Sequence, residues 1–181
     1  MQEIWSIRTR LQTIGNRRDL ALFNLAIDSK LRGCDLVRLR VSDVASGGEI
    51  LSRATVRQRK TKRPVRFEIT ERTRKSTQDW IEKAQLTEND YLFPSRVKRF
   101  PHLSTRQYAR IVNDWVRAIG LDPSGYGTHS LRRTKATLIY RRTKNLRAVQ
   151  LLLGHTNLDS TVRYLGIEID DALEMSEQID V

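Results

Sequence analysis

Leu151–Tyr164 reads LLLGHTNLDSTVRY, a segment in which one short helix ends and another begins. The first helix is expected to stop at Gly154, because glycine readily takes the left-handed conformation that closes a helix. His155 follows this glycine directly. The next helix carries an apolar stripe at intervals of four and three residues: Leu158, Val162 and Leu165. Tyr164 lies off that stripe, so the segment predicts two short helices that present a histidine and a tyrosine outside their core.

A second segment, GTHSLRR at residues 127–133, places a histidine and an arginine at the start of a helix. His129 and Arg132 are three residues apart and therefore share one helix face. Thr128 is a candidate N-cap for a helix that runs to about Arg142. Unpaired N–H groups at a helix N-terminus attract anions, so this segment predicts a phosphate site.

A β-hairpin is predicted where the hydrophobic period changes from helical to alternating. Residues 53–57 and 65–69 alternate apolar and polar side chains, which is typical of two half-buried strands. Residues 59–63 form the turn between them. Lys60 and Lys62 are then expected to project from the hairpin tip.

Helical periodicity covers most of the remaining chain. Arg17–Leu31 predicts a helix with Arg32 at its C-terminal end, and a second short helix starts near residues 35–39. Residues 108–119 predict another amphipathic helix. The fold class expected is mixed α+β, mainly α-helical, with a small antiparallel hairpin or sheet near residues 43–69.

Positive charge is abundant and unevenly placed. The 181 residues include 33 Lys and Arg against 21 Asp and Glu, a formal net charge of +12. Residues 53–66 and 132–147 each hold seven bases and no acid, whereas residues 165–181 hold six acids and no base. Setting those six acids aside leaves +18 on residues 1–164. This imbalance indicates a polyanionic partner, nucleic acid before membrane.

Several other protein classes are disfavoured by composition. Cys34 is the single cysteine, so no internal disulfide can form, and the N-terminus lacks the apolar run of a signal peptide. No apolar stretch is long enough for a membrane span, and three histidines with one cysteine argue against a dedicated metal site. We expect a cytoplasmic or nuclear protein without a membrane partner, nucleoid-associated if its host is a bacterium.

Five chemical features of the chain follow an order that resembles the catalytic domain of the tyrosine recombinase (phage integrase) family. That family has an early arginine after a helix, a hairpin lysine, a His-x-x-Arg box, a histidine or tryptophan after Leu-Gly, and a late tyrosine. The matching positions are Arg32 in SKLRGCDLVRL, Lys60 in QRKTKRPV, His129 and Arg132 in GTHSLRR, His155 in LLGHTN, and Tyr164 in STVRYL. Asp35 stands where the family usually has a glutamate. The resemblance covers about Arg17 to Tyr164.

The resemblance implies a site-specific DNA recombinase or integrase that cleaves and rejoins strands through a 3′-phosphotyrosyl intermediate. Arg32 and Arg132 would clamp the phosphate, since two guanidiniums suit the charge that grows on its nonbridging oxygens. Tyr164 would be the nucleophile. The resemblance implies no metal and no cofactor.

The remaining site residues would handle protons and hydrogen bonds. Lys60 would protonate the departing 5′-oxygen, His129 would accept the tyrosine proton, and His155 would hydrogen-bond the phosphate. Lys62 lies on the same hairpin tip and stays an alternative to Lys60.

The implied partners are double-stranded DNA and other protomers of the same protein in a synaptic complex, with accessory DNA-bending proteins as a further class. Residues 1–164 would form the catalytic domain. Residues 165–181 would be an acidic tail, either part of the same domain or exchanged with a neighbouring protomer. About sixteen residues precede Arg17, so we expect no N-terminal core-binding domain in this chain, which is either a minimal recombinase or a catalytic fragment.

Two alternative functions remain open at this stage. A type IB topoisomerase-like enzyme would use the same tyrosine chemistry to relax DNA without exchanging partners. A non-catalytic DNA-binding relative would keep the fold and the charge. The complete set of catalytic residue types argues against the latter, and the acidic tail favours a recombinase over a topoisomerase.

Overall fold

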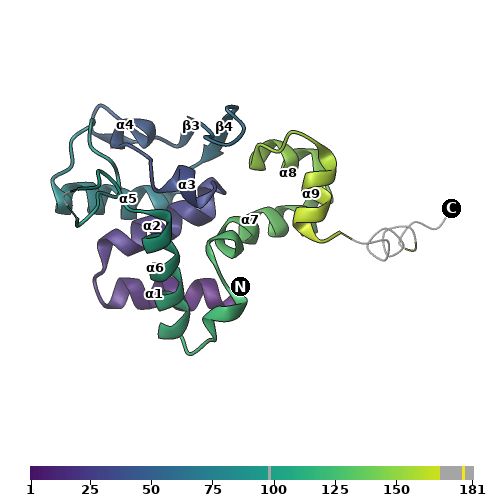
Figure 1. Ribbon diagram of the computed structural model, residues 1–181, viewed down its shortest axis with the longest axis horizontal. Coiled ribbons are helices and arrows are strands. Elements are labelled where there is room, and N and C mark those ends of the chain that lie inside the picture. The colour runs from purple at the N-terminus through teal and green to yellow at the C-terminus, as the bar shows by residue number, and fades with distance from the viewer. Residues whose placement is uncertain (98, 168–176, 178–181) are drawn as a thin grey trace.

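The computed structural model describes residues 1–97, 99–167 and 177, and it is mainly helical with two small antiparallel sheets (Figure 1). The helices are α1 (Gln2–Thr13), α2 (Arg17–Ser29), α3 (Gly33–Leu36), α4 (Val41–Val44), α5 (Glu71–Ala84), α6 (Thr105–Ala118), the 3-10 turn η1 (Pro123–Gly125), α7 (Thr128–Thr143), α8 (Leu146–Leu153) and α9 (Leu158–Leu165). The strands are β1 (Ala45–Ser46), β2 (Glu49–Ile50), β3 (Arg53–Arg57) and β4 (Pro64–Glu68). The predicted fold class is confirmed. No helix among the described residues has the length and apolar character needed to cross a bilayer.

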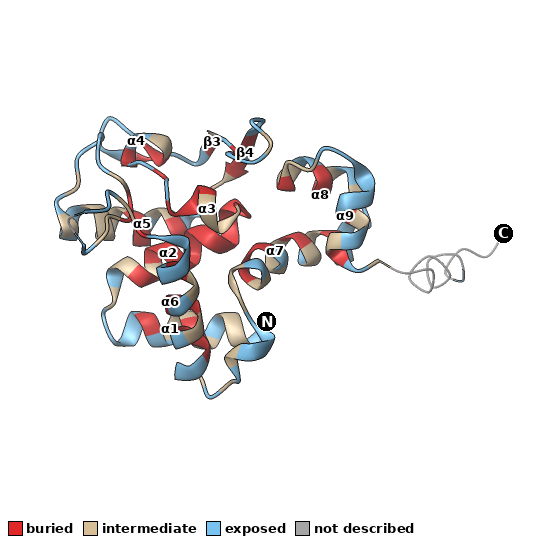
Figure 2. Cartoon of the chain, in the orientation of Figure 1, coloured by how far each residue is buried: buried red, intermediate tan, exposed pale blue. Residues whose placement is uncertain are grey.

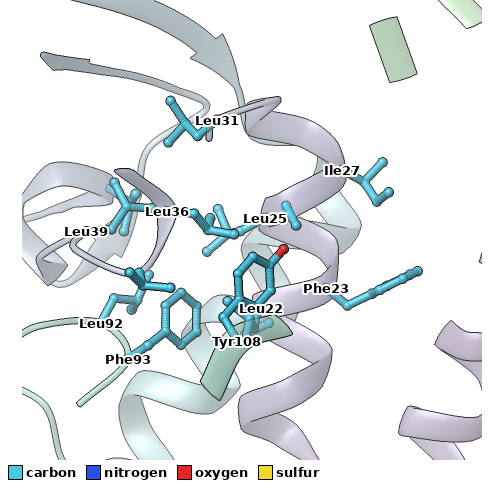
Figure 3. Close-up of a cluster of buried hydrophobic side chains, with 14 of the residues drawn as sticks. Leu22, Phe23, Leu25, Ile27, Leu31, Leu36, Leu39, Leu92, Phe93 and Tyr108 are labelled. Carbon is cyan, nitrogen blue, oxygen red and sulfur yellow. The ribbon is translucent and has the colours of Figure 1, made fainter. Parts of the chain in front are cut away.

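Helix α2 is the centre of the larger hydrophobic core. Asn16 caps its start by accepting a hydrogen bond from the Asp19 N–H, and ten of its residues are buried. Leu22 and Leu25 point into a cluster that also includes Leu36 of α3 and Tyr108 of α6 (Figure 3). Burying each large apolar side chain contributes about 1.5–3 kcal/mol, so this cluster holds α1–α6 together as one body.

A smaller second core joins α7, α8 and α9. Its buried members are Ala136, Tyr140, Val149, Leu153 and Leu165. Helix α7 belongs to both cores, because Leu131 in its first turn is buried in the larger cluster and Ala136 in the smaller one. Figure 2 shows this division, with the densest burial around α2 and a separate buried strip along α7 to α9. The segment that carries Tyr164 is therefore a small unit attached to the side of the main body.

The predicted hairpin is confirmed, with β3 and β4 paired in antiparallel register. Ala54 lies opposite Phe67, and both side chains are buried. The turn is closed by two backbone hydrogen bonds, from the Gln58 N–H to Arg63 O (2.9 Å) and from the Lys62 N–H to Gln58 O (2.8 Å). These bonds fix the tip on which Lys60 lies.

A buried ionic cluster fastens α7 to the body. The Lys135 Nζ lies 2.7 Å from Asp28 Oδ1 and 2.5 Å from Glu68 Oε1. Lys30, whose side chain is fully buried, donates to both Glu68 oxygens at 3.1 and 3.2 Å. Burial lowers the pKa of Lys30, and the Glu68 carboxylate opposes that change. Buried charges are costly without partners, so the cluster holds α2, β4 and α7 in one arrangement.

Two local predictions are wrong. Thr128 is the first residue of α7 and not its N-cap; Gly127 takes the cap position, and its N–H donates to Ser130 Oγ at 3.1 Å. The apolar stripe predicts Leu158 in the core of α9, but Leu158 is 43% exposed, whereas Thr161 is fully buried. The smaller core has few members, and it does not reach Leu158.

Candidate active site

One surface cavity of about 370 Å³ collects all six site residues predicted from the sequence. Its lining consists of Arg32, Lys60, Thr61, His129, Arg132, His155, Thr156, Ser160 and Tyr164. These residues come from the turn after α2, the hairpin tip, the start of α7, the turn between α8 and α9, and α9 itself. The fold thus brings together parts of the chain that are far apart in sequence.

Arg132 forms the buried wall of this cavity, with 2% of its surface exposed. One terminal nitrogen, Nη2, donates to the Leu153 carbonyl at 2.8 Å. Nε and Nη1 are buried, and neither has a hydrogen-bond partner among the described residues. Burial lowers the pKa of Arg132 to about 10, which still leaves the group protonated at neutral pH. Buried donors without partners are costly, so this guanidinium is prepared for an anion that would satisfy them.

Arg32 supplies the second guanidinium. It is the N-cap residue of α3, directly after the chain leaves α2 through Lys30 and Leu31. Its Nη1 donates to Gln58 Oε1 at 2.5 Å. Gln58 follows β3 and is fully buried, so Arg32 is held from the hairpin side of the cavity.

His155 is held between Arg132 and Thr161. Its Nε2 lies 3.4 Å from the Arg132 Nη2 and its Nδ1 lies 3.1 Å from the Thr161 Oγ1. Arginine can only donate, so Nε2 accepts there and Nδ1 carries the proton that is donated to Thr161. Burial lowers the pKa of His155 to about 4, and the charges of Arg132 and Arg32 add to this effect. The imidazole is therefore neutral at pH 7.

Tyr164 points its hydroxyl at the start of α7, where it donates to the His129 carbonyl at 3.4 Å. Its ring meets His155 edge to face, with centroids 5.3 Å apart, and the Arg132 Cζ lies 5.6 Å from the ring centroid. Burial raises the pKa of Tyr164, against the opposing charges of Arg132 and neighbouring arginines. The phenol is protonated at neutral pH and needs a base to become a nucleophile.

The two lysines of the hairpin tip face different cavities. Lys60 lines the cavity with Tyr164, whereas Lys62 lines a neighbouring one with Asp35 and Arg38. Lys62 has a positive φ of 56°, so the backbone turns between the two side chains. This placement favours Lys60 as the site residue.

Sequence reasoning missed Gln58 and Thr161. Both are fully buried polar residues that contact a predicted site residue. The signal that could have found them is phase: Gln58 continues the inward alternation of Ala54 and Val56, and Thr161 lies one helical turn before the buried Leu165. A polar residue in the buried phase of an element needs a partner.

A helical domain with two arginines, two histidines, a lysine and a tyrosine around one cavity is the catalytic domain of a tyrosine recombinase. The chain belongs to the phage integrase family, whose model matches residues 2–168. The family places the chain among the DNA strand-transferring enzymes.

Named relatives agree with this assignment. The chain is 34% identical to the probable integrase/recombinase YoeC of Bacillus subtilis over 155 residues, which is 86% of this chain and 81% of YoeC. It is 32% identical to a tyrosine recombinase of Pseudothermotoga lettingae over 152 residues, which is 84% of this chain and 50% of that protein. The chain thus spans most of YoeC but only half of the second relative.

Solved structures show the same fold. The XerA recombinase matches with a TM-score of 0.77 and 24% identity, over 98% of this chain and 63% of XerA. The XerH site-specific recombinase bound to its difH substrate matches with a TM-score of 0.76 and 20% identity, over 97% of this chain and 52% of XerH.

Proposed function

We propose that this chain cleaves and rejoins DNA as a site-specific recombinase, through a covalent 3′-phosphotyrosyl intermediate. One observation carries the proposal: Tyr164 lines the same cavity as Arg132, and two buried nitrogens of Arg132 have no hydrogen-bond partner among the described residues. A bound anion would supply that partner. Both groups belong to one chain, so each protomer would cleave with its own tyrosine.

Two arginines would stabilise the reacting phosphate. The Tyr164 oxygen attacks phosphorus, the new O–P bond forms, and the bond from phosphorus to the 5′-oxygen breaks. Negative charge grows on the nonbridging oxygens during this displacement. Arg132, through Nε and Nη1, and Arg32 would bind those oxygens, because preorganised donors in a buried site stabilise developing charge.

Two further side chains would move the protons. His129 would accept the phenolic proton of Tyr164, and Lys60 would donate a proton to the departing 5′-oxygen. His155 would hydrogen-bond a nonbridging oxygen through Nε2, which must carry a proton to donate, so DNA binding would change the tautomer or the charge of the free imidazole. Rejoining reverses these steps: a 5′-hydroxyl attacks phosphorus, and the tyrosine leaves with its proton restored.

The DNA backbone would run over the exposed basic side chains around the cavity. On the hairpin side these are Arg57, Arg59, Lys62 and Arg63, and on the α7 side Arg133, Arg141 and Arg142. Phosphate contacts of this kind hold the duplex without reading its sequence, and their strength falls as salt rises.

Recombination also needs a second protomer. We propose that the acidic segment 165–181 docks on a neighbouring protomer during synapsis or folds back on its own body when the protein is alone. Only residues 165–167 and 177 of it lie within the described part of the chain. Ile167 packs against the smaller core, which gives the tail a fixed starting point beside Tyr164. Accessory DNA-bending proteins as a further partner class, and a cytoplasmic location that is nucleoid-associated if the host is a bacterium, belong to the same proposal.

Covalent capture tests the function and identifies the target site in one experiment. The protein is incubated with duplexes that carry randomised sequence around one 5′-bridging phosphorothiolate, and adducts are recovered under denaturing conditions and sequenced. The 5′-thiolate that leaves rejoins poorly, so adducts accumulate. We expect one enriched sequence with the wild type and no adduct with Tyr164→Phe.

The outcomes separate the proposed function from its rivals. Adducts that survive in Tyr164→Phe would remove the nucleophile from the scheme. Binding without adducts would identify a non-catalytic DNA-binding protein. Adducts without sequence enrichment, together with relaxation of supercoiled DNA, would indicate a topoisomerase.

A further inference from the structure

We propose that Gln58 is a positioning residue that sets both arginines of the active site and attaches the tyrosine-bearing unit to the hairpin. The inference rests on the proposed strand-transfer function. It adds a role for a residue that touches neither the substrate phosphate nor the nucleophile.

The side chain of Gln58 makes three hydrogen bonds inside the protein. Its Oε1 accepts from Arg32 Nη1 at 2.5 Å and from the Thr61 hydroxyl at 3.0 Å. Its Nε2 donates to the Leu153 carbonyl at 3.1 Å. Gln58 is also fully buried, so water does not compete for these bonds. One amide therefore connects Arg32, the hairpin turn and the end of α8.

The Leu153 carbonyl extends this network to the second arginine. It accepts from Gln58 Nε2 and also from Arg132 Nη2 at 2.8 Å. Arg32 and Arg132 are thus joined by a continuous path of hydrogen bonds through one amide and one carbonyl. Moving any part of that path would change the spacing of the two guanidiniums.

Only an amide meets these demands. The oxygen faces two donors and the nitrogen faces a carbonyl, which fixes the orientation of the group. A carboxylate would keep both acceptors but set a negative charge against the Leu153 oxygen. An apolar side chain of equal length would leave Arg32 and Leu153 without their shared partner.

Close packing at Gly154 supports the same role. Gly154 adopts φ +65°, and a Cβ there would overlap Val65 Cγ2 and lie 3.0 Å from Gln58 Oε1. The backbone directly before His155 is therefore pressed against β4 and the Gln58 amide. This contact lies outside the smaller core, so Gln58 and Val65 are where the tyrosine-bearing unit meets the hairpin.

The test uses single-turnover adduct formation on the captured target site, with DNA affinity and thermal unfolding measured in parallel. Gln58→Met keeps the length and removes the amide. We expect adduct formation to slow by about 10- to 100-fold, because small displacements of catalytic groups cost this much. Affinity for DNA should change by less than about threefold, since the substitution leaves the exposed basic side chains that bind the DNA backbone unchanged.

Asn24→Leu is the matched control. It also removes a buried amide, which donates to Ser76 Oγ at 2.9 Å within the larger core. Asn24 is absent from the cavity lining. If Asn24→Leu lowers the unfolding temperature as much as Gln58→Met but leaves the rate unchanged, lost stability does not explain the slower reaction.

A double-mutant cycle tests whether Gln58 acts through Arg32. In an Arg32→Ala background, Gln58→Met should slow the reaction less than it does in the wild type, because residues that act together are not additive. The part that remains is the effect on Arg132 through the Leu153 carbonyl. Gln58→Glu is the second variant, because Arg32 favours the ionised carboxylate, which keeps the acceptors but repels the Leu153 oxygen. Its rate should be at least about 10-fold below wild type from pH 5.5 to 8, and this readout replaces Gln58→Met if that variant does not fold.

A Gln58→Met or Gln58→Glu rate within threefold of wild type, or a fully additive cycle, would overturn the role of Gln58 and leave the proposed function intact. A folded wild type that forms no adducts on any duplex would instead overturn the proposed function, and the role of Gln58 with it.

Discussion

Arg132 uses one nitrogen to bind the protein and keeps two buried nitrogens without partners among the described residues. The fixed end orients the guanidinium, and Arg132 lines the cavity. A surface arginine would lose orientational entropy at each binding event, whereas Arg132 is ordered before DNA arrives.

Arg132→Ala should therefore slow adduct formation by at least about 10²-fold, and Arg132→Lys should restore it only in part, because an ammonium lacks the planar fork. Arg110→Ala is the control, since Arg110 is exposed on α6 and is absent from the cavity lining. The measurement is the single-turnover rate at saturating DNA. Equal rates for Arg132→Ala and the wild type would contradict the phosphate clamp.

His155 should make stability depend on pH in a definite direction. Its pKa is about 4 in the folded chain, against an ordinary value of 6.5. Between pH 4 and pH 6.5, His155 is protonated in the unfolded chain but neutral in the folded chain, so the free energy of unfolding falls as pH falls from 6.5 towards 4. Above pH 7 His155 is neutral in both states, so it no longer makes the free energy of unfolding depend on pH.

The comparison variant is His155→Gln, which cannot titrate. We expect the unfolding temperature of the wild type to fall more between pH 7 and pH 5 than that of His155→Gln. Circular dichroism at each pH measures both. Parallel curves would mean that His155 is not held neutral by its surroundings.

At this scale the sequence predicts the residues whose identity the chemistry demands. Tyr164 and Arg132 stand out because their proposed roles, nucleophile and phosphate ligand, can be filled by few residue types. Gln58 and Thr161 do not, because their roles depend on which backbone atoms and side chains lie opposite them. That information exists only once β3, α8 and α9 have been placed.

The hairpin is the element that brings Lys60, the proposed general acid, to the cavity. Its tip is closed by backbone bonds of Gln58, and Lys60 and Lys62 leave it towards different cavities. Strand alternation predicted both strands but could not separate the two lysines. The positive φ at Lys62 turns the chain between them. The alternation of apolar and polar residues along the strands does not predict this turn geometry.

A 5′-bridging sulfur substrate separates the lysines by function. A thiolate leaves without a proton, so this substrate should restore the rate of Lys60→Ala and should not restore that of Arg132→Ala. Lys62→Ala is the matched control on the same tip. Its proposed contact with the DNA backbone affects affinity, so at saturating DNA we expect it to react with the ordinary oxygen substrate within about threefold of wild type. Sulfur rescue of Lys62→Ala in place of Lys60→Ala would transfer the role by two residues.

The whole molecule has two cores of unequal size joined by α7. Periodicity predicted α2, α6 and α9 but did not assign α1 or α5, and the residues predicted from the motifs line one cavity. The division into a body and a tyrosine-bearing unit could not be predicted, because it depends on which helix faces meet. Leu158 shows the limit: its spacing fits the stripe of α9, but the smaller core does not reach it.

The tail should matter for assembly more than for cleavage. Deleting residues 168–181 keeps Ile167, which packs on the smaller core, and removes all six acids. We expect adduct formation on one site to persist and recombination between two sites to be impaired, because the apolar residues among the acids suit one side of a docked helix. Native gels of protein–DNA complexes and a two-plasmid recombination assay provide the two measurements. Equal loss in both assays would leave the tail without a role in synapsis.

The oxygen on which Gln58 and Arg132 converge belongs to the main chain at Leu153. Every amino acid carries such an oxygen, so a substitution at this position can disturb packing but cannot delete the acceptor. A residue-by-residue comparison among relatives would register nothing there, even where the arrangement is kept. This part of the active site therefore depends on the path of the backbone. Whether relatives keep it can be seen by superposing their structures, but not by aligning their sequences.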